Sequence, residues 1–201
     1  MSETLFDPIE DVIEAFKNGD IIVMTDDEDR ENEGDLICAA EKVTPEIINF
    51  MITHARGLVC VPMEEVQLRR LGLSRMTPAH SSDKYHTAFM DSVDIRSGTT
   101  TGISAGDRSA TIQALVSDSS QAADFIKPGH VFPLKAVHGG VLERDGHTEG
   151  TVDLARICGM KAAGVICEIL RDDGEMMRML ELREFANKHG LKMTAVSEIV
   201  K

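Results

Sequence analysis

Short apolar runs alternate with amphipathic helical segments along nearly the whole chain, and this alternation limits the possible folds more than any other feature. Seven runs predict strands, at residues 21–25, 36–40, 58–63, 87–95, 132–137, 165–170 and 191–196. Helical periodicity and capping signals predict helices at residues 8–17, 44–54, 64–73, 110–116, 147–159 and 174–190. Because composition does not break along the chain, residues 1–201 are predicted to form a single α/β domain, with helices flanking a mixed sheet in three layers.

The charge of the chain excludes several classes of function. Lys and Arg total 21 against 34 Asp and Glu, which gives a net charge of -13. Nucleic-acid binding is disfavoured, because it requires clustered cations. No apolar run approaches the ~20 residues of a membrane span, and the N-terminus lacks the basic start of a signal peptide. We therefore expect a cytoplasmic protein.

The acidity is concentrated between Asp26 and Asp35, where seven acidic residues surround a single base, Arg30. Such a run is most often a solvated loop. Here it lies between two predicted strands, and the embedded arginine suits a site that handles both a cation and an anion. An EF-hand frame starting at Asp29 fails, because Ala40 stands where the bidentate glutamate is needed.

A second candidate cluster lies where a glycine-rich loop enters the helix predicted from residue 147. His147 and Thr148 would occupy its N-terminus, which attracts anions, and Arg144 lies three residues before His147. His147 is either a hydrogen-bonded structural residue or a ligand. Glu168 is the carboxylate of an otherwise apolar strand, so it either faces solvent or acts as a partly buried base.

The remaining motifs are weaker. Four cysteines, at positions 38, 60, 158 and 167, form no C-x-x-C pair and are predicted to be buried core residues, although Cys60 could border a site. Residues 102–106 match G-x-S-x-G, but no buried strand precedes Ser104, as a nucleophile elbow requires. Residues 81–84 match S-x-x-K without its companion motifs.

Four segments, taken together, resemble one known family. The acidic window of residues 26–35, the TTTG of 99–102, the PGHVFPL of 128–134 and the GHTE of 146–149 are similar to the motifs of 3,4-dihydroxy-2-butanone 4-phosphate synthases, in the same order. The resemblance implies a lyase of riboflavin biosynthesis that converts D-ribulose 5-phosphate to L-3,4-dihydroxy-2-butanone 4-phosphate and formate. It also implies a magnesium requirement and a homodimer. Since the chain stops at Lys201 without the zinc-binding cysteines of a GTP cyclohydrolase II domain, we expect a monofunctional form.

The resemblance also assigns roles to individual residues. It implies that Glu31 and His147 bind the metal and that Glu168, His130 and Asp35 are catalytic. Substrate contacts are expected from Arg30, Glu31, Asp35, Arg144, Asp145, Gly146, His147, Thr148 and Glu168. Ser104 becomes part of a loop that shapes the site.

These residue types suit the implied reaction. Enolisation of the sugar phosphate needs a base beside a carbonyl and a cation that stabilises the enediolate. A histidine ligand is less typical of magnesium, so manganese should also support activity. Asp35 or a neighbouring acid is expected to serve early proton transfers, and Glu168 a later one. The polar stretch 74–83 and the acidic window are candidates for closure over the substrate. Two other classes stay open: a serine hydrolase using Ser104, and a non-catalytic metal-binding module.

Overall fold

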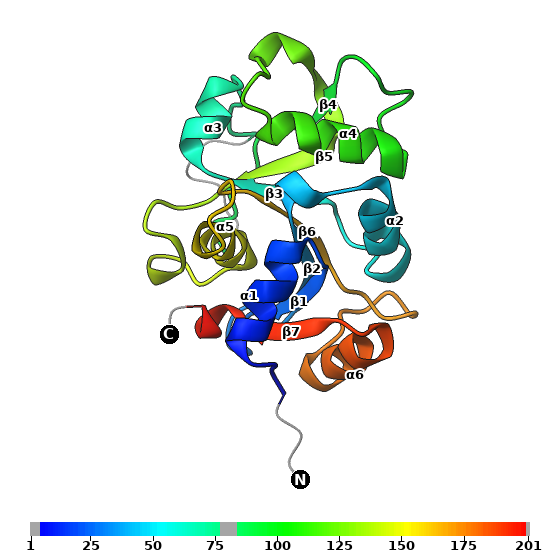
Figure 1. Ribbon diagram of the computed structural model, residues 1–201, viewed down its shortest axis with the longest axis vertical. Helices are drawn as coiled ribbons and strands as arrows, with labels where there is room; N and C mark the ends of the chain where they lie inside the picture. The colour runs from blue at the N-terminus through cyan, green and yellow to red at the C-terminus, as the bar shows by residue number, and fades with distance from the viewer. Residues whose placement is uncertain (1–4, 77–83, 200–201) are drawn as a thin grey trace.

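The computed structural model describes residues 5–76 and 84–199, and its centre is one seven-stranded sheet (Figure 1). The strands are β1 (Ile22–Thr25), β2 (Gly34–Ala39), β3 (Cys60–Met63), β4 (Val93–Ile95), β5 (Phe125–Lys135), β6 (Gly164–Glu168) and β7 (Lys192–Ala195). Their order is β4-β5-β3-β6-β2-β1-β7. Two of the pairs, β1 with β7 and β3 with β5, are parallel, and the others are antiparallel. The predicted mixed α/β sheet is therefore confirmed.

Six α-helices cover the sheet in the part of the chain that the structure describes. They are α1 (Ile9–Asn18), α2 (Pro45–His54), α3 (Glu65–Arg70), α4 (Ala105–Val116), α5 (His147–Ile157) and α6 (Met179–His189). Alternate residues of each strand point to opposite faces. Val23, Leu36 and Cys167 belong to a core shared with α2, α4 and α6. The opposite face packs against α1 and α5 through residues such as Ile37 and Ile166. The two cores make the three predicted layers.

The helix boundaries follow from capping signals in the sequence. Thr44 caps α2 by accepting a hydrogen bond from the Ile47 N–H at 3.3 Å. The last turns of α1 and α6 are each followed by a left-handed glycine, as predicted. None of the helices in the described part of the chain has the length and apolar character needed to traverse a lipid bilayer.

Four elements begin five or more residues away from their predicted start. Strand β4 begins only at Val93, six residues later than predicted, because Phe89 and Met90 before it form only isolated bridges. Helix α4 begins at Ala105, five residues earlier than predicted, because Ser104 caps it. Helix α6 begins only at Met179, since the residues before it form a turn. Strand β5 starts seven residues earlier than predicted, and its first half is largely exposed where it pairs with β4. An exposed polar strand lacks the apolar run on which strand prediction depends.

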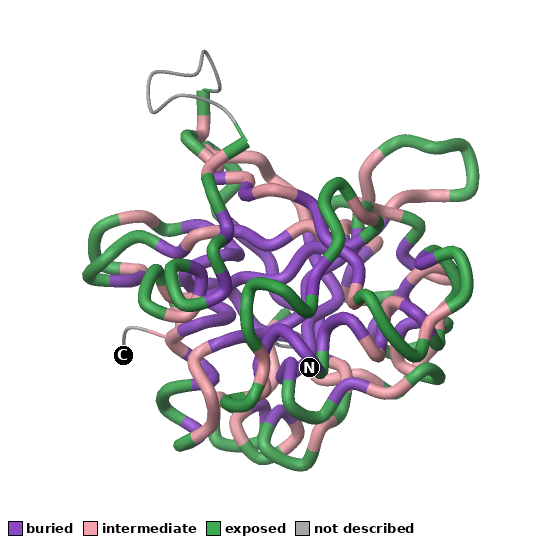
Figure 2. The backbone as a smooth tube through the Cα atoms, turned by 90° about the horizontal axis from the view of Figure 1, so that it is seen from above, coloured by how far each residue is buried: buried purple, intermediate pink, exposed green. Residues whose placement is uncertain are grey.

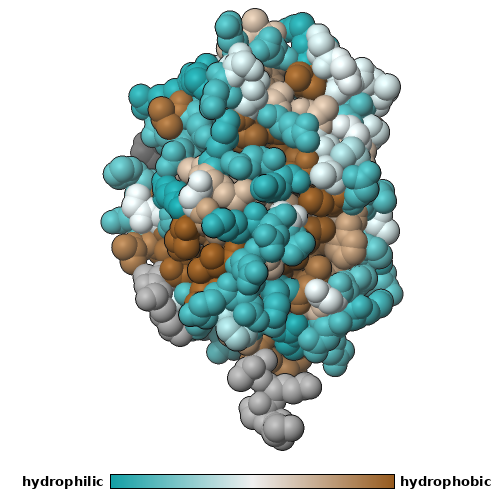
Figure 3. All heavy atoms as spheres, viewed as in Figure 1, coloured by the Kyte–Doolittle hydropathy of each residue, from teal (hydrophilic) through white to brown (hydrophobic). Residues whose placement is uncertain are grey.

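Burial is concentrated where the sheet lies between the helices, and exposed segments are mostly loops and outer helix faces (Figure 2). The four cysteines are free thiols and all are buried, as predicted. The face drawn in Figure 3 is mainly hydrophilic, with hydrophobic side chains showing between the polar ones.

Candidate active site

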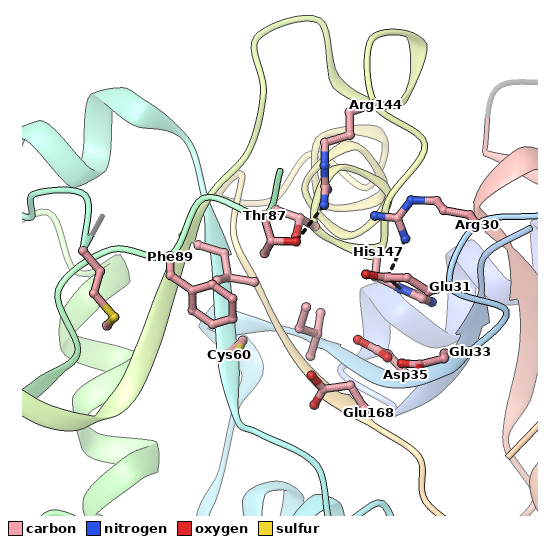
Figure 4. A pocket seen from close by; sticks show the side chains of 14 residues that line it. Arg30, Glu31, Glu33, Asp35, Cys60, Thr87, Phe89, Arg144, His147 and Glu168 are labelled. Carbon is pink, nitrogen blue, oxygen red and sulfur yellow. Dashed lines mark hydrogen bonds and ion pairs between the residues drawn. The ribbon is translucent and has the colours of Figure 1, made fainter. Parts of the chain in front are cut away.

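A cavity of about 540 Å³ opens on the sheet face that carries α1 and α5. It is acidic on one wall, basic at one end and apolar on the remaining side (Figure 4). The lining residues are Arg30, Glu31, Glu33, Asp35, Cys60, Met76, Thr87, Phe89, Leu134, Arg144, His147, Thr148, Ile166 and Glu168.

Asp26 organises the acidic loop between β1 and β2. Its side chain is buried, and its two oxygens accept hydrogen bonds from the Glu31 N–H (3.0 Å), the Glu33 N–H (2.8 Å) and Arg30 Nη1 (2.7 Å). Local bonds of this kind replace the backbone partners that a loop lacks. The loop is thereby folded back on Asp26, and the side chains of Glu31 and Glu33 line the cavity.

Glu31 and His147 meet at the inner end of this loop, as the sequence predicted. His147 Nδ1 lies 3.8 Å from Glu31 Oε2, and the same carboxylate binds Arg30 Nη1 at 2.5 Å. Burial alone would raise the pKa of Glu31, but its contact with His147 and the charge of Arg30 lower it to about 2. Burial opposes charge on His147, but the neighbouring carboxylates Asp35 and Glu31 raise its pKa to about 9. The surroundings therefore favour a positive charge at this point.

Asp35 and Glu168 lie directly opposite each other on the antiparallel strands β2 and β6, so both side chains project from the same face. Glu168 Oε2 accepts a hydrogen bond from the Leu58 N–H at 2.8 Å and lines the cavity, which excludes the solvent-facing alternative. Asp35 is buried, and its Oδ1 has no hydrogen-bond partner among the described residues. Burial raises the pKa of Asp35 to about 7, and the charge of Glu168 adds to the shift. A carboxyl group titrating near neutrality suits proton transfer.

The basic end of the cavity is built around the N-terminus of α5. Gly146 caps the helix, and the buried side chains of His147 and Thr148 form its first turn. Arg144 points into the cavity from the side opposite Asp35 and Glu168 (Figure 4). Free N–H groups at a helix N-terminus, together with arginine, bind phosphate-type anions.

The sequence-predicted site residues are therefore mostly brought together. Asp145 and Gly146 do not line the cavity themselves but contact an arginine that does: Asp145 Oδ1, on a side chain that is 73% exposed, lies 3.7 Å from Arg30 Nε. His130 lies further away, outside the cavity of its own chain. It stands four residues before Leu134 on β5, about 13 Å along the strand, and its Nδ1 lies 2.7 Å from Asp94 Oδ2.

Sequence reasoning gave no role to several residues that the structure places at the site. Asp26 was visible only as one acid among seven. Thr87 and Phe89 lie in the predicted strand 87–95 and Met76 in the stretch considered for closure, but no motif assigned a role to any of the three. Cys60, predicted to be core with a site border left open as the alternative, is buried and also lines the cavity.

The serine motifs do not form a second site in the described part of the chain. Ser104 accepts a hydrogen bond from the Asp107 N–H at 3.0 Å and so acts as a helix cap. It does not line the cavity, so the expectation that its loop shapes the site finds no support within one chain. The serines of the S-x-x-K match, and residues 77–83 of the segment considered for closure, lie outside the described residues.

A family model described as 3,4-dihydroxy-2-butanone 4-phosphate synthase matches residues 10–201. The chain is 54% identical over 196 residues to the riboflavin biosynthesis protein RibBA of Bacillus subtilis (strain 168), and 51% identical over 201 residues to the RibBA of Aquifex aeolicus (strain VF5). These matches cover 98% and 99% of this chain and 49% of each relative. The chain thus spans about half the length of the curated relatives it matches.

Solved structures agree with these matches. A 3,4-dihydroxy-2-butanone 4-phosphate synthase of Candida albicans superposes with a TM-score of 0.89 at 46% identity, covering 98% of this chain and 97% of that one. A second synthase, solved in complex with two magnesium ions, has a TM-score of 0.92 at 44% identity, covering 96% and 95%.

Proposed function

The chain belongs to the 3,4-dihydroxy-2-butanone 4-phosphate synthase family, and we propose that it converts D-ribulose 5-phosphate to L-3,4-dihydroxy-2-butanone 4-phosphate and formate in riboflavin biosynthesis. One observation carries the proposal. A single cavity joins a wall of carboxylates and an imidazole to a basic end at the N-terminus of α5. A substrate with vicinal hydroxyls at one end and a phosphate at the other matches this polarity.

The acidic loop fits a divalent cation. One ligand atom from each of Asp26, Glu31 and His147 lies within 4.8 Å of the others, and His147 Nε2 is buried without a hydrogen-bond partner among the described residues. Because the oxygens of Asp26 already accept three hydrogen bonds, Glu31 and His147 are the proposed ligands. Bound there, magnesium or manganese would stabilise negative charge developing on the substrate oxygens.

The phosphate is proposed to bind at the basic end. Arg30 and Arg144 lie on two sides of Gly146, where a Cβ atom would stand 2.9 Å and 2.3 Å from their guanidinium nitrogens. The glycine thus allows both arginines to approach the first turn of α5. Thr148 lines the cavity beside them, and we propose that the Asp145–Gly146 turn, which adjoins Arg30, also contributes polar groups.

Proton transfers are assigned to the carboxylate pair across β2 and β6. Asp35, buried and facing the cavity, is proposed to remove the proton from the carbon beside the carbonyl during enolisation. Glu168, whose Oε2 is oriented by the Leu58 N–H, is proposed to serve a later transfer during dehydration, rearrangement and loss of the one-carbon unit. The two residues are direct partners on adjacent strands, so the register of the sheet fixes their backbone positions relative to each other.

We propose a homodimer in which His130 serves the cavity of the other copy. His130 lies outside its own cavity, is 44% exposed and is oriented by Asp94. Mixing His130→Ala chains with Glu31→Ala chains, each inactive alone, should restore formate release through mixed dimers. Mixtures that stay inactive, despite exchange of subunits, would contradict a shared site.

We also place the enzyme in the cytoplasm. The four free, buried thiols are those expected of a protein that folds in a reducing compartment.

The test is formate release from ribulose 5-phosphate with magnesium, with and without EDTA. Formate should appear with magnesium and disappear on chelation, and Glu31→Ala should lower kcat by about 10²-fold or more. Ser104→Ala removes only the cap of α4 and should retain activity, whereas a serine hydrolase would lose it. No formate from the wild-type chain with magnesium would refute the proposal and favour a metal-binding module.

A further inference from the structure

Glu149 is a buried carboxylate that contacts one of the two arginines at the basic end. It lies in the first turn of α5 and is 1% exposed. One oxygen, Oε1, accepts a hydrogen bond from the Val137 N–H at 2.9 Å, and the other, Oε2, pairs with Arg144 Nη1. A carboxylate so deeply buried requires such partners. The bond to Val137 tethers the segment after β5 to α5, but the second oxygen is directed at a residue of the cavity.

Arg144 is held on three sides. Its Nε donates to the Tyr85 carbonyl at 3.0 Å, its Nη2 donates to Thr87 Oγ1 at 3.0 Å, and its Nη1 binds Glu149 (Figure 4 marks the bond to Thr87). These contacts use all three nitrogens but only three of the five N–H donors of a guanidinium. The side chain is 13% exposed and lines the cavity. It is thus fixed before any anion binds, which reduces the entropy lost on binding.

The charges of the cavity explain why such a tether is needed. Glu31, Glu33, Asp35 and Glu168 all line the same cavity as Arg144. Arg30 is already bound to two carboxylates of the acidic loop, Asp26 and Glu31. An Arg144 side chain without a carboxylate of its own would be attracted to this acidic wall. Glu149 supplies that carboxylate from outside the cavity and so holds Arg144 at the opposite end.

A second acid of α5 provides a comparison for Glu149, because it anchors the same segment of the chain without contacting Arg144. Asp153, one turn later on α5, accepts a hydrogen bond from the Val141 N–H at 2.8 Å and pairs with Arg156. Asp153 and Glu149 therefore both anchor the segment between β5 and α5. Only Glu149 contacts Arg144.

We propose that Glu149 is a positioning residue, which holds the Arg144 guanidinium at the basic end of the cavity in the orientation that binds the phosphate of the substrate. The inference rests on the proposed function for the identity of the substrate, but it can be tested with inorganic phosphate alone.

The experiment measures phosphate affinity by titration calorimetry, together with KM, kcat and thermal stability. Glu149→Gln keeps the shape and an acceptor for the Val137 N–H but loses the charged acceptor for Arg144. We expect phosphate to bind about tenfold more weakly or worse, the loss typical of a charge-assisted hydrogen bond. KM should rise by a similar factor while kcat changes less. Asp153→Asn, the matched control, should lower thermal stability without changing phosphate affinity.

A double-mutant cycle decides whether Glu149 acts through Arg144. In an Arg144→Ala background, Glu149→Gln should cause no further loss of phosphate affinity. An equal loss in both backgrounds, or the same affinity in Glu149→Gln and Asp153→Asn, would overturn the proposal. If Glu149→Gln is too unstable to measure, Thr87→Val provides a second test, because it removes the hydrogen bond that Arg144 Nη2 donates to Thr87 Oγ1. This variant should also weaken phosphate binding, and an unchanged phosphate affinity would overturn the proposal that Arg144 must be held in place. A wild-type chain that binds phosphate but releases no formate refutes the proposed function instead.

Discussion

A methyl group at position 146 tests whether the two arginines act together, because Gly146 lies between their guanidinium groups. A Cβ atom there would stand 2.3 Å from Arg144 Nη1 and 2.9 Å from Arg30 Nη2. Cβ atoms do not approach other heavy atoms closer than about 3.0 Å, so Arg144 must retreat by about 0.7 Å or more. Its three anchors resist this movement, including the buried Glu149.

The backbone itself tolerates alanine, since Gly146 has φ -98° and ψ 162°, an extended conformation open to any residue. Losing glycine at the helix cap should cost no more than about 1 kcal/mol of unfolding free energy. The effect on catalysis should be larger, because a displacement of nearly 1 Å in a substrate-positioning group lowers the rate by about 10²-fold. Gly146→Ala should therefore lower kcat/KM for formate release by about 10²-fold, with a folded circular dichroism spectrum.

Gly106→Ala is the matched control. Gly106 lies in the first turn of α4, and a Cβ atom there would meet only Ser104 Oγ, at 3.8 Å. This variant should keep kcat/KM and gain about 0.5–1 kcal/mol of stability, because alanine is the better helix former. The reasoning would be refuted if Gly146→Ala retained kcat/KM within about threefold of the wild type.

Three further predictions concern other parts of the molecule. Asp35→Asn should lower kcat for formate release by about 10²-fold or more. It should nevertheless raise the unfolding free energy in EDTA at pH 8. The pKa of Asp35 is about 7 in the folded chain against an ordinary value of 3.8, so its ionisation destabilises the fold increasingly from pH 4 to 7 and fully above. A variant less stable than the wild type at pH 8 would contradict this. Asp7→Asn should lower the unfolding free energy by about 1 kcal/mol at neutral pH. Burial opposes ionisation of Asp7, but its hydrogen bonds, including the one from Arg183, lower its pKa below 3.8. The stability that Asp7 contributes is therefore complete above pH 4 and is lost as the pH falls through that lower pKa. A difference in unfolding free energy between wild type and variant that persists to pH 2 in urea titrations would count against it. Thr44→Ala should cost about 1 kcal/mol through loss of the bond to the Ile47 N–H, and an unchanged urea midpoint would show that the cap contributes nothing.

The sequence identified the elements best where side-chain pattern and backbone geometry agree. Helix α2 was predicted at both ends, because Thr44 and Pro45 mark its start and the apolar face of the helix continues to its last turn. Strand β6 was equally clear from its apolar run. The first half of β5 was missed, since its residues pair in the sheet without being buried.

The residues of the candidate site were likewise identified from the sequence only where a local pattern marks them. His147 and Arg144 could be singled out because their motif is local and lies at a helix start, whereas Glu31 was distinguished from its acidic neighbours only by the family resemblance. Asp26 could not be separated from its acidic neighbours, because its role depends on three hydrogen bonds formed only in the folded loop. Thr87 contacts Arg144 across 57 residues of sequence, a distance that no local pattern reports.

By itself, the sequence determined the class of fold and the kinds of side chain at the site. Both depend on patterns between residues near each other in the chain: apolar periodicity, helix caps, and the motifs of the acidic loop and of the helix N-terminus. Only the tertiary structure decided which groups meet. The antiparallel register of β2 and β6 places Asp35 against Glu168, and α5 aims Glu149 at Arg144. Strand pairing and helix packing join residues far apart in the chain, so the environment that shifts the pKa of Asp35 and fixes Arg144 exists only after folding.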